Sequence, residues 1–153
     1  MHIKITCCIV VVDWLVLCMQ VIEMSGITFD QFACLAICNT LDVKAYRISA
    51  ETSEEKFRAL IAAKTRTATD VVVVSYFRGG LGQTGTGHFS PVGGYHPGRD
   101  LVLILDVARF KYPPHWVTVS QLYKAMAFID STTGWQLASL LLYLIKAMSK
   151  VRS

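Results

Sequence analysis

Residues 87–110, GHFSPVGGYHPGRDLVLILDVARF, predict a β-hairpin that carries a histidine on one strand and an aspartate on the other. Apolar residues flank Pro97 and Gly98 on both sides, and this dipeptide is typical of a chain reversal. A reversal centred there places His88 opposite Asp106 in an antiparallel pair, unless a bulge shifts the register by one residue. We therefore expect the two side chains on the same face and within hydrogen-bonding distance.

A paired histidine and aspartate admit two interpretations. In the first, the carboxylate fixes the tautomer of the imidazole, which then serves as general base to a serine or a cysteine. In the second, the histidine is a buried side chain in a sheet, and its acidic neighbour satisfies its polar atoms. The pair alone does not decide between catalysis and structure, and the position of a nucleophile is the open question.

The composition indicates a single domain. The chain has 153 residues, of which 53% are hydrophobic and 17% charged, which is enough for one core and too little for two. The formal net charge of +4 is spread thinly, without the block of like charge that indicates nucleic-acid binding. Five irregularly spaced cysteines describe no disulfide framework, and the N-terminal residues show no clean secretory signal. We expect reduced thiols in a cytoplasmic protein that binds no nucleic acid.

Three segments of the chain differ in character. Residues 1–23 form an apolar segment of uncertain origin, and its apolar run at 5–22 is broken by Asp13. As a membrane span this run is at the short limit, and a central charge costs about 2.5 to 3.5 kcal/mol, so a membrane anchor is the less favoured alternative. Residues 24–134 carry the motifs, and residues 135–153 form a divergent apolar tail with late basic residues, which predicts a helix.

Helical and strand patterns both occur in the middle segment, which predicts an α+β fold with an antiparallel sheet and short helices. The expected elements are a helix at 28–38, a strand at 43–48, a helix at 53–64 and a strand that begins at Asp70. Capping-box spacings support both helices, Thr28 with Gln31 and Thr52 with Glu55. The run VVVVSYF suits the centre of a sheet, and the GGLGQTG loop after it lacks the lysine that a Walker phosphate loop requires.

The segments ITFDQFACLAIC (27–38) and GQTGTGHFSPVGGYHPGRDLVLILDVARFKYPPHWV (82–117) resemble phytochelatin synthase, the glutathione γ-glutamylcysteinyltransferase family. The resemblance implies an incomplete papain-like cysteine-proteinase domain. It implies that a cysteine attacks the Cys–Gly amide of glutathione, that glycine leaves, and that γ-Glu-Cys passes to a second glutathione or a phytochelatin. Because phytochelatins sequester heavy metals, the implied partners are glutathione, phytochelatins and heavy-metal ions. No tightly bound cofactor is implied, since cadmium or zinc enters largely as a glutathione thiolate.

The resemblance also assigns roles to residues of this sequence. It makes His88 the general base and Asp106 the acid that orients it, and it assigns Arg109 to the acyl donor. A guanidinium suits the α-carboxylate of the γ-glutamyl group because it can bind both oxygens. The weaker substrate-binding candidates are Gly87, Lys111 and Tyr112.

The cysteines raise two further expectations. Cys34 and Cys38 have an i, i+4 spacing that suits a shared soft metal ion, but small apolar neighbours favour buried structural thiols, so we predict no metal site in the protein. The family nucleophile lies in a motif like PAYCGLAS, and no such motif occurs in this sequence. We therefore expect a fragment of an acyltransferase that is inactive as this isolated chain. The alternative is a non-catalytic remnant that binds glutathione or its metal thiolate, or a fragment that does not fold.

Overall fold

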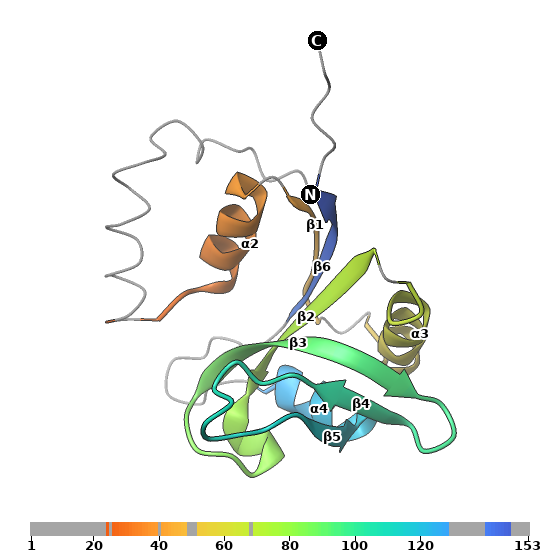
Figure 1. The fold of residues 1–153 in the computed structure, drawn as a ribbon. Coiled ribbons are helices and arrows are strands. Elements are labelled where there is room, and N and C mark those ends of the chain that lie inside the picture. Colours follow the sequence, from red (N-terminus) through yellow and green to blue (C-terminus); the bar gives the residue numbers. More distant parts are fainter. Residues whose placement is uncertain are drawn as a thin grey trace.

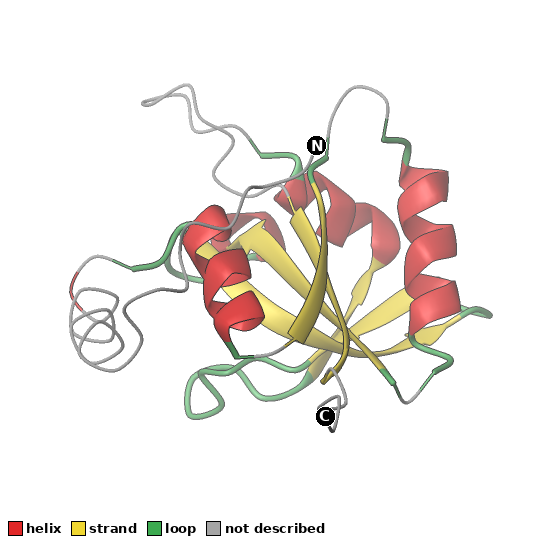
Figure 2. Ribbon diagram, turned by 90° about the horizontal axis from the view of Figure 1, so that it is seen from above, coloured by secondary structure: helices red, strands yellow, loops and turns green. Residues whose placement is uncertain are grey.

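The computed structural model describes residue 24 and residues 26–39, 41–48, 52–67, 69–128 and, by its backbone, 140–147. Within these residues the chain forms a six-stranded antiparallel sheet in the order β1-β6-β2-β3-β4-β5. The helices are α2 (Phe29–Cys38), α3 (Glu54–Lys64), α4 (Val119–Met126) and the short 3-10 helix η1 (Arg78–Leu81). The strands are β1 (Leu41–Tyr46), β2 (Asp70–Phe77), β3 (Gly87–His96), β4 (Leu101–Ile104), β5 (His115–Thr118) and β6 (Leu140–Ala147). The predicted α+β class is confirmed (Figures 1 and 2).

Strand β2 is buried on both faces, as its β-branched run predicted. Val72 and Val74 belong to the main core, which α3 and α4 cover. Val73 points the other way and packs with Ala33 of α2 in a second, smaller cluster. Figure 1 shows α2 beside β1 and β6, apart from α3 and α4. Burial on both faces explains why a continuous apolar run forms this strand.

Strand β3 joins the two halves of the sheet, because its first half pairs with β2 and its second half pairs with β4. The register of the second pairing shifts between Val92 and Gly94. At Gly93, between them, a Cβ atom would lie 2.9 Å from Cγ of Leu105. Glycine therefore leaves room for the Leu105 side chain to lie against β3.

The hairpin turn differs from the sequence prediction. Residues 97–100 lie between the two strands, and His96 pairs with Leu101. The reversal is thus centred one residue later than expected, and the predicted register is wrong. Asp100 adopts a left-handed φ of 52°, and its carboxylate accepts a hydrogen bond from Nε of Arg58 at 2.9 Å. A contact from α3 therefore fixes a longer turn than Pro-Gly alone would form.

Helix α2 is confirmed with its predicted capping box and its predicted end. Helix α3 is confirmed as an element, but its predicted capping box from Thr52 to Glu55 is wrong. Ser53 caps α3 instead, because its hydroxyl accepts a hydrogen bond from the amide of Lys56 at 3.2 Å. The hydroxyl of Thr52 is engaged elsewhere, donating to the carbonyl of Arg47 at 3.4 Å.

The helix predicted for the 135–153 tail is wrong within the described residues. Residues 140–147 form β6, which pairs with β1 on one side and with β2 on the other. A short apolar run suits a central strand as well as a buried helix, and hydrogen bonding along both edges favours the strand. Strand β1, which borders it, covers Leu41–Tyr46 rather than the predicted 43–48. No helix of the described residues is long and apolar enough to span a membrane, and the run at 5–22 lies outside those residues.

Candidate functional site

The candidate site lies where β2, η1, β3 and the chain after β4 meet. The chain leaves β2 through η1 and returns through residues 82–86 to β3, in which His88 is the second residue. The amide of Arg78 donates to the carbonyl of Thr86 at 3.0 Å, and Gly82 takes a left-handed φ of 70° that glycine tolerates. This turn places the first residue of η1 beside the start of β3.

His88 and Asp106 lie within hydrogen-bonding distance of each other, as predicted, although their register is not the predicted one. Nε2 of His88 lies 3.0 Å from Oδ1 of Asp106. Asp106 lies beyond the end of β4, where the amide of Leu105 still donates to the carbonyl of Pro91 at 2.9 Å. The amide of Ala108 donates to Oδ1 of Asp106 at 2.8 Å and fixes a carboxylate whose residue is only 1% exposed. The longer turn shifts the strand register away from the predicted one. The bulge in β3 and the path of the chain after β4 shift it back, so that His88 still meets Asp106.

Arg78 completes the cluster with His88 and Asp106, and it was not predicted from the sequence. Its Nη2 lies 2.6 Å from Nε2 of His88 and donates to Oδ1 of Asp106 at 3.1 Å. Its Nη1 lies 3.0 Å from Oδ2 of Asp106 and donates to Gln83, which in turn contacts Nε2 of His115 at 3.0 Å. Arg78 is only 6% exposed, and the Asp106 carboxylate compensates for the cost of burying its positive charge. The sequence carried one signal for this residue, since Arg78 directly follows a strand predicted to be buried. A buried arginine requires an acidic or polar partner, so this position indicates a buried charged pair.

The charges in this cluster favour a neutral histidine beside an ionised aspartate. Burial of the imidazole, and then the charge of Arg78, lower the pKa of His88, while Asp106 opposes them. Burial of Asp106 disfavours its ionisation, but hydrogen bonds from Arg78 and from the Ala108 amide, together with nearby charges, outweigh burial and lower its pKa. At neutral pH the imidazole is therefore uncharged, as a general base must be.

Tyr76 supports His88 from the core side of the sheet. The edge of one ring faces the other, with 5.9 Å between the ring centroids. The hydroxyl of Tyr76 lies 3.1 Å from Oγ of Ser90, and both residues are fully buried. Burial raises the pKa of Tyr76, so the group stays neutral and adds no charge beside the histidine.

Tyr112, a predicted substrate-binding residue, connects the loop after β4 to the loop after η1. Its phenol oxygen accepts a hydrogen bond from the amide of Thr84 at 2.8 Å and lies 3.0 Å from the Thr84 hydroxyl. These two hydrogen bonds lower the pKa of Tyr112. The guanidinium carbon of Arg78 lies 4.9 Å from the centre of its ring, and Nζ of Lys111 lies 5.6 Å from it. Tyr112 and Lys111 therefore border the cluster through Arg78.

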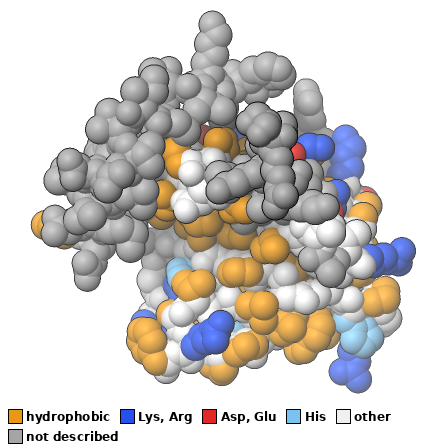
Figure 3. Space-filling view, turned by 45° about the horizontal axis from the view of Figure 1, so that its top comes forward, with side chains coloured by type: hydrophobic (Ala, Val, Ile, Leu, Met, Phe, Trp, Pro, Cys, Tyr) orange, Lys and Arg blue, Asp and Glu red, His pale blue; other side chains and the backbone are white. Residues whose placement is uncertain are grey.

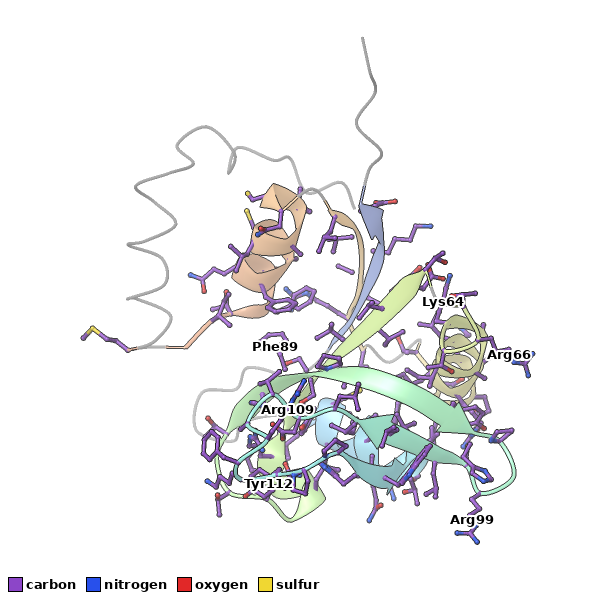
Figure 4. The ribbon with its side chains drawn as sticks, viewed as in Figure 1. Lys64, Arg66, Phe89, Arg99, Arg109 and Tyr112 are labelled. Carbon is purple, nitrogen blue, oxygen red and sulfur yellow. The ribbon has the colours of Figure 1, made fainter. Side chains whose placement is uncertain are left out.

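Arg109 and Gly87 stand at the margin of the cluster. Arg109 is exposed, and Figure 4 shows it with Tyr112 toward the end of the sheet at which β3 begins. Gly87 opens β3 and pairs with Phe77, so it contributes backbone groups only. Figure 3 shows hydrophobic side chains between separate basic ones on one face of the molecule. Phe110, in the same loop as Arg109, is 95% exposed. The side chain of Arg109 is thus accessible to solvent.

The weak metal candidates lie elsewhere in the fold. Cys34 and Cys38 are half-buried on α2, which packs mainly against β1 and β6 and reaches β3 through Phe32, whose ring stacks on that of Phe89 at 4.7 Å. Within the described part of the chain, no three His, Cys, Asp or Glu side chains gather in a way that could hold a metal ion. The two thiols are therefore not brought to the candidate site.

Comparison with known proteins agrees with the resemblance of the sequence motifs. A family model described as phytochelatin synthase matches residues 5–136. Glutathione gamma-glutamylcysteinyltransferase 3 of Lotus japonicus is 51% identical over 118 residues, covering 77% of this chain and 24% of that protein. Glutathione gamma-glutamylcysteinyltransferase 1 of Arabidopsis thaliana is 47% identical over 116 residues, covering 76% and 24%. A Schizosaccharomyces pombe protein of the same name is 42% identical over 113 residues, covering 74% and 27%.

The matched relatives are much longer than this chain, which spans about a quarter of their length. The match nevertheless includes every residue of the His88 cluster, because the family model covers 5–136 without leaving out β2, β3 or β4. Both the extent of the match and the identity are sufficient to assign the family. This chain belongs to the phytochelatin synthase family.

Proposed function

We propose that this chain supplies the base and the orienting acid for the transfer of γ-Glu-Cys from glutathione, on part of a papain-like domain. The observation that carries the proposal is the 3.0 Å contact between Nε2 of His88 and the buried carboxylate of Asp106 in a member of the phytochelatin synthase family. The names of the matched relatives state the same transferase activity for those proteins.

His88 moves the protons in the proposed reaction, and Asp106 orients it. A cysteine gives its proton to His88, and its thiolate attacks the carbonyl carbon of the Cys–Gly amide. The C–N bond then breaks, glycine leaves with the proton from His88, and a thioester remains. The α-amine of a second glutathione or of a phytochelatin attacks the thioester and gives its proton to His88, and the thiolate leaves. Asp106 stabilises the imidazolium that forms in each half of the reaction.

Arg109 is the residue that we propose to bind the acyl donor. Its exposed guanidinium can take the α-carboxylate of the γ-glutamyl group through two parallel hydrogen bonds. Lys111 and Tyr112 lie on the Arg78 side of the same loop and are the secondary candidates, with the backbone of Gly87. Cadmium or zinc enters as the glutathione thiolate in this proposal, in the cytoplasm, and requires no resident metal site.

The nucleophile is the component that we do not place among the cysteines of this sequence. No motif like PAYCGLAS occurs in the sequence, and among the described residues neither Cys34 nor Cys38 gathers with the histidine and aspartate of the site. A base and its orienting acid cannot form the thioester without a nucleophile. We therefore propose that the chain releases no glycine unless a segment that carries the family nucleophile is joined to it.

Reconstitution tests this proposal. The purified chain, alone and joined to the nucleophile-bearing segment of a relative, is incubated with glutathione and cadmium, and released glycine and γ-Glu-Cys polymers are measured. We expect no release from the chain alone, release from the joined protein, and loss of that release in His88→Ala. Release from the chain alone would place the nucleophile among its five cysteines. Release from the joined protein that survives His88→Ala would exclude His88 as the base.

The substrate-binding role of Arg109 has a separate test. Calorimetric titration with glutathione compares Arg109→Gln with Arg66→Gln, since Arg66 is also exposed but lies beyond α3 (Figure 4). Loss of affinity in the first variant alone is the expected result. Equal affinity in both variants would remove Arg109 from the donor site.

A non-catalytic remnant is the second candidate function, and the missing nucleophile motif favours it. Such a protein would bind glutathione or its metal thiolate without cleaving it. Saturable binding to the isolated chain, combined with no glycine release after the nucleophile segment is joined, would support this function over the transferase.

A further inference from the structure

The contact between Arg78 and His88 has a consequence for the position of the imidazole proton. Three atoms lie within hydrogen-bonding distance of one another: Nη2 of Arg78, Nε2 of His88 and Oδ1 of Asp106. The distance is 2.6 Å from Nη2 to Nε2, 3.1 Å from Nη2 to Oδ1, and 3.0 Å from Nε2 to Oδ1. A guanidinium is only a donor and a carboxylate is only an acceptor, so Nε2 can take just one of two roles between them. Whichever role it takes, one of its two contacts is unfavourable.

The shortest contact selects the role. If Nε2 carried a proton, two N–H donors would face each other at the 2.6 Å between Arg78 and His88. If Nε2 is bare, it accepts a hydrogen bond from Arg78, and the neutral imidazole carries its proton on Nδ1. A base needs a bare nitrogen toward the thiol, whereas Asp106 can orient the ring only by accepting a proton from Nε2. The arrangement seen here is therefore the opposite of the one that catalysis requires.

We propose that Arg78 is a positioning residue that holds the proton of His88 on Nδ1 and must release Nε2 before His88 can act as a base. This inference rests on the proposed function for its meaning, but the proton position can be measured without turnover. In the released state Arg78 keeps its bonds to Asp106 and Gln83, while Nε2–H of His88 donates to Oδ1 of Asp106.

The attachment of Arg78 to the carboxylate is suited to such a release. Its Nη1 lies 3.0 Å from Oδ2 of Asp106, yet Oδ2 has no hydrogen-bond partner among the described residues, so the ion pair is not a two-bond fork. The guanidinium is held in addition by Gln83 and by the ring of Tyr112, which belong to two different loops. Loss of the single contact to Nε2 leaves all these partners in place.

The groups that face His88 agree with a neutral ring. From η1 it meets Arg78, from the chain after β4 it meets Asp106, and from β2 it meets the edge of Tyr76. The pKa of His88 is lowered by burial and then by Arg78, and Tyr76 is neutral at ordinary pH because its pKa is raised. Substitution of Arg78 therefore removes the second cause of the lowered pKa and the donor to Nε2 together.

Nitrogen-15 NMR of the imidazole tests the proposal on the full chain. The chemical shifts of Nδ1 and Nε2 are followed from pH 5 to pH 8, with His88→Gln used to assign the signals. In the unsubstituted chain we expect the proton on Nδ1 at neutral pH. In Arg78→Gln we expect the proton to move to Nε2 and the titration midpoint to rise. Arg78→Lys retains a charged donor and should return both properties toward those of the unsubstituted chain.

Arg58→Gln is the matched control, because Arg58 also binds carboxylates but lies on α3 at the hairpin turn. It should leave the tautomer and the midpoint of His88 unchanged. A proton on Nε2 in the unsubstituted chain overturns the proposal, and so does an Arg78→Gln spectrum identical to that of the unsubstituted chain. If circular dichroism shows that Arg78→Gln does not fold, the tautomer of the unsubstituted chain and the Arg78→Lys spectrum decide. A chain that neither binds nor cleaves glutathione still gives this readout, so failure of the transferase function remains distinguishable.

Discussion

Two arginine–carboxylate pairs in this molecule have the same chemistry and different burial. The side chains of Arg78 and Asp106 are 8% and 0% exposed, whereas those of Arg58 and Asp100 are 31% and 38% exposed. Both carboxylates have a lowered pKa. Water screens the exposed pair, which can fix a turn but exerts little field on its surroundings. In the buried pair the low dielectric lets the same charges act on the imidazole of His88.

The largest expected effect comes from removing the buried carboxylate. Asp106→Ala leaves the charge of Arg78 buried without its partner, which should lower the free energy of unfolding by about 3 to 5 kcal/mol. Urea unfolding followed by circular dichroism measures the loss. Adding Arg78→Met to this variant removes the orphaned charge and should restore part of the stability. A loss no larger than that of Asp100→Ala would break the comparison between the two pairs.

The exposed pair should give a smaller loss. Asp100→Ala removes the acceptor for Arg58 and for the hydroxyl of Tyr95, and it places alanine at a φ of 52°. We expect the free energy of unfolding to fall by about 1 kcal/mol, because solvent screens the ion pair. Asp100→Asn tolerates the left-handed conformation and keeps an acceptor, so it should cost less. A cost above that of Asp106→Ala would mean that the turn, rather than the buried cluster, limits stability.

The sequence predicted the parts of the fold that depend on short-range patterns. The capping box of α2 is formed by residues three apart, and the burial of β2 on both faces follows from its continuous β-branched run. The turn between β3 and β4 failed because Arg58, distant in the sequence, fixes Asp100. Residues 140–147 failed because their apolar run fits either a helix or a strand, and only the neighbouring strands decide.

The sequence predicted two members of the candidate site, His88 and Asp106, but not the third, Arg78. His88 and Asp106 were paired on the correct premise that a hairpin brings its strands together, and their approach to hydrogen-bonding distance was confirmed although the register was wrong. Arg78 was missed because its position directly after a buried strand indicates burial without indicating which partner it meets. Its burial follows from the turn through η1, which carries it back over β3 toward a carboxylate 28 residues away in the chain.

The pH dependence of stability should also separate the two pairs. The pKa of His88 is lowered in the folded state, so the unfolded chain binds a proton first as the pH falls below the ordinary value of 6.5. The free energy of unfolding should therefore decrease from pH 7 toward pH 5, with a slope below the limit of about 1.4 kcal/mol per pH unit for one proton. His88→Gln should flatten this part of the profile, and Asp100→Asn should not. Asp106 has a lowered pKa as well, so its contribution is retained there and lost only in stronger acid.

The smallest effect is expected at the rim of the buried pair. Tyr112→Phe removes the hydrogen bonds with Thr84 but retains the ring on which the Arg78 guanidinium rests. We argue that burial, and not the number of contacts, distinguishes the Arg78–Asp106 pair from the Arg58–Asp100 pair. Loss of the two exposed hydrogen bonds with Thr84 should then lower Tm by less than Asp100→Ala does. The titration midpoint of His88 should also stay near its original value, because the charge of Arg78 is still in place. A midpoint that moves as far as in Arg78→Gln would show that Tyr112 holds the guanidinium against the imidazole, and the cluster would then extend into the loop after β4.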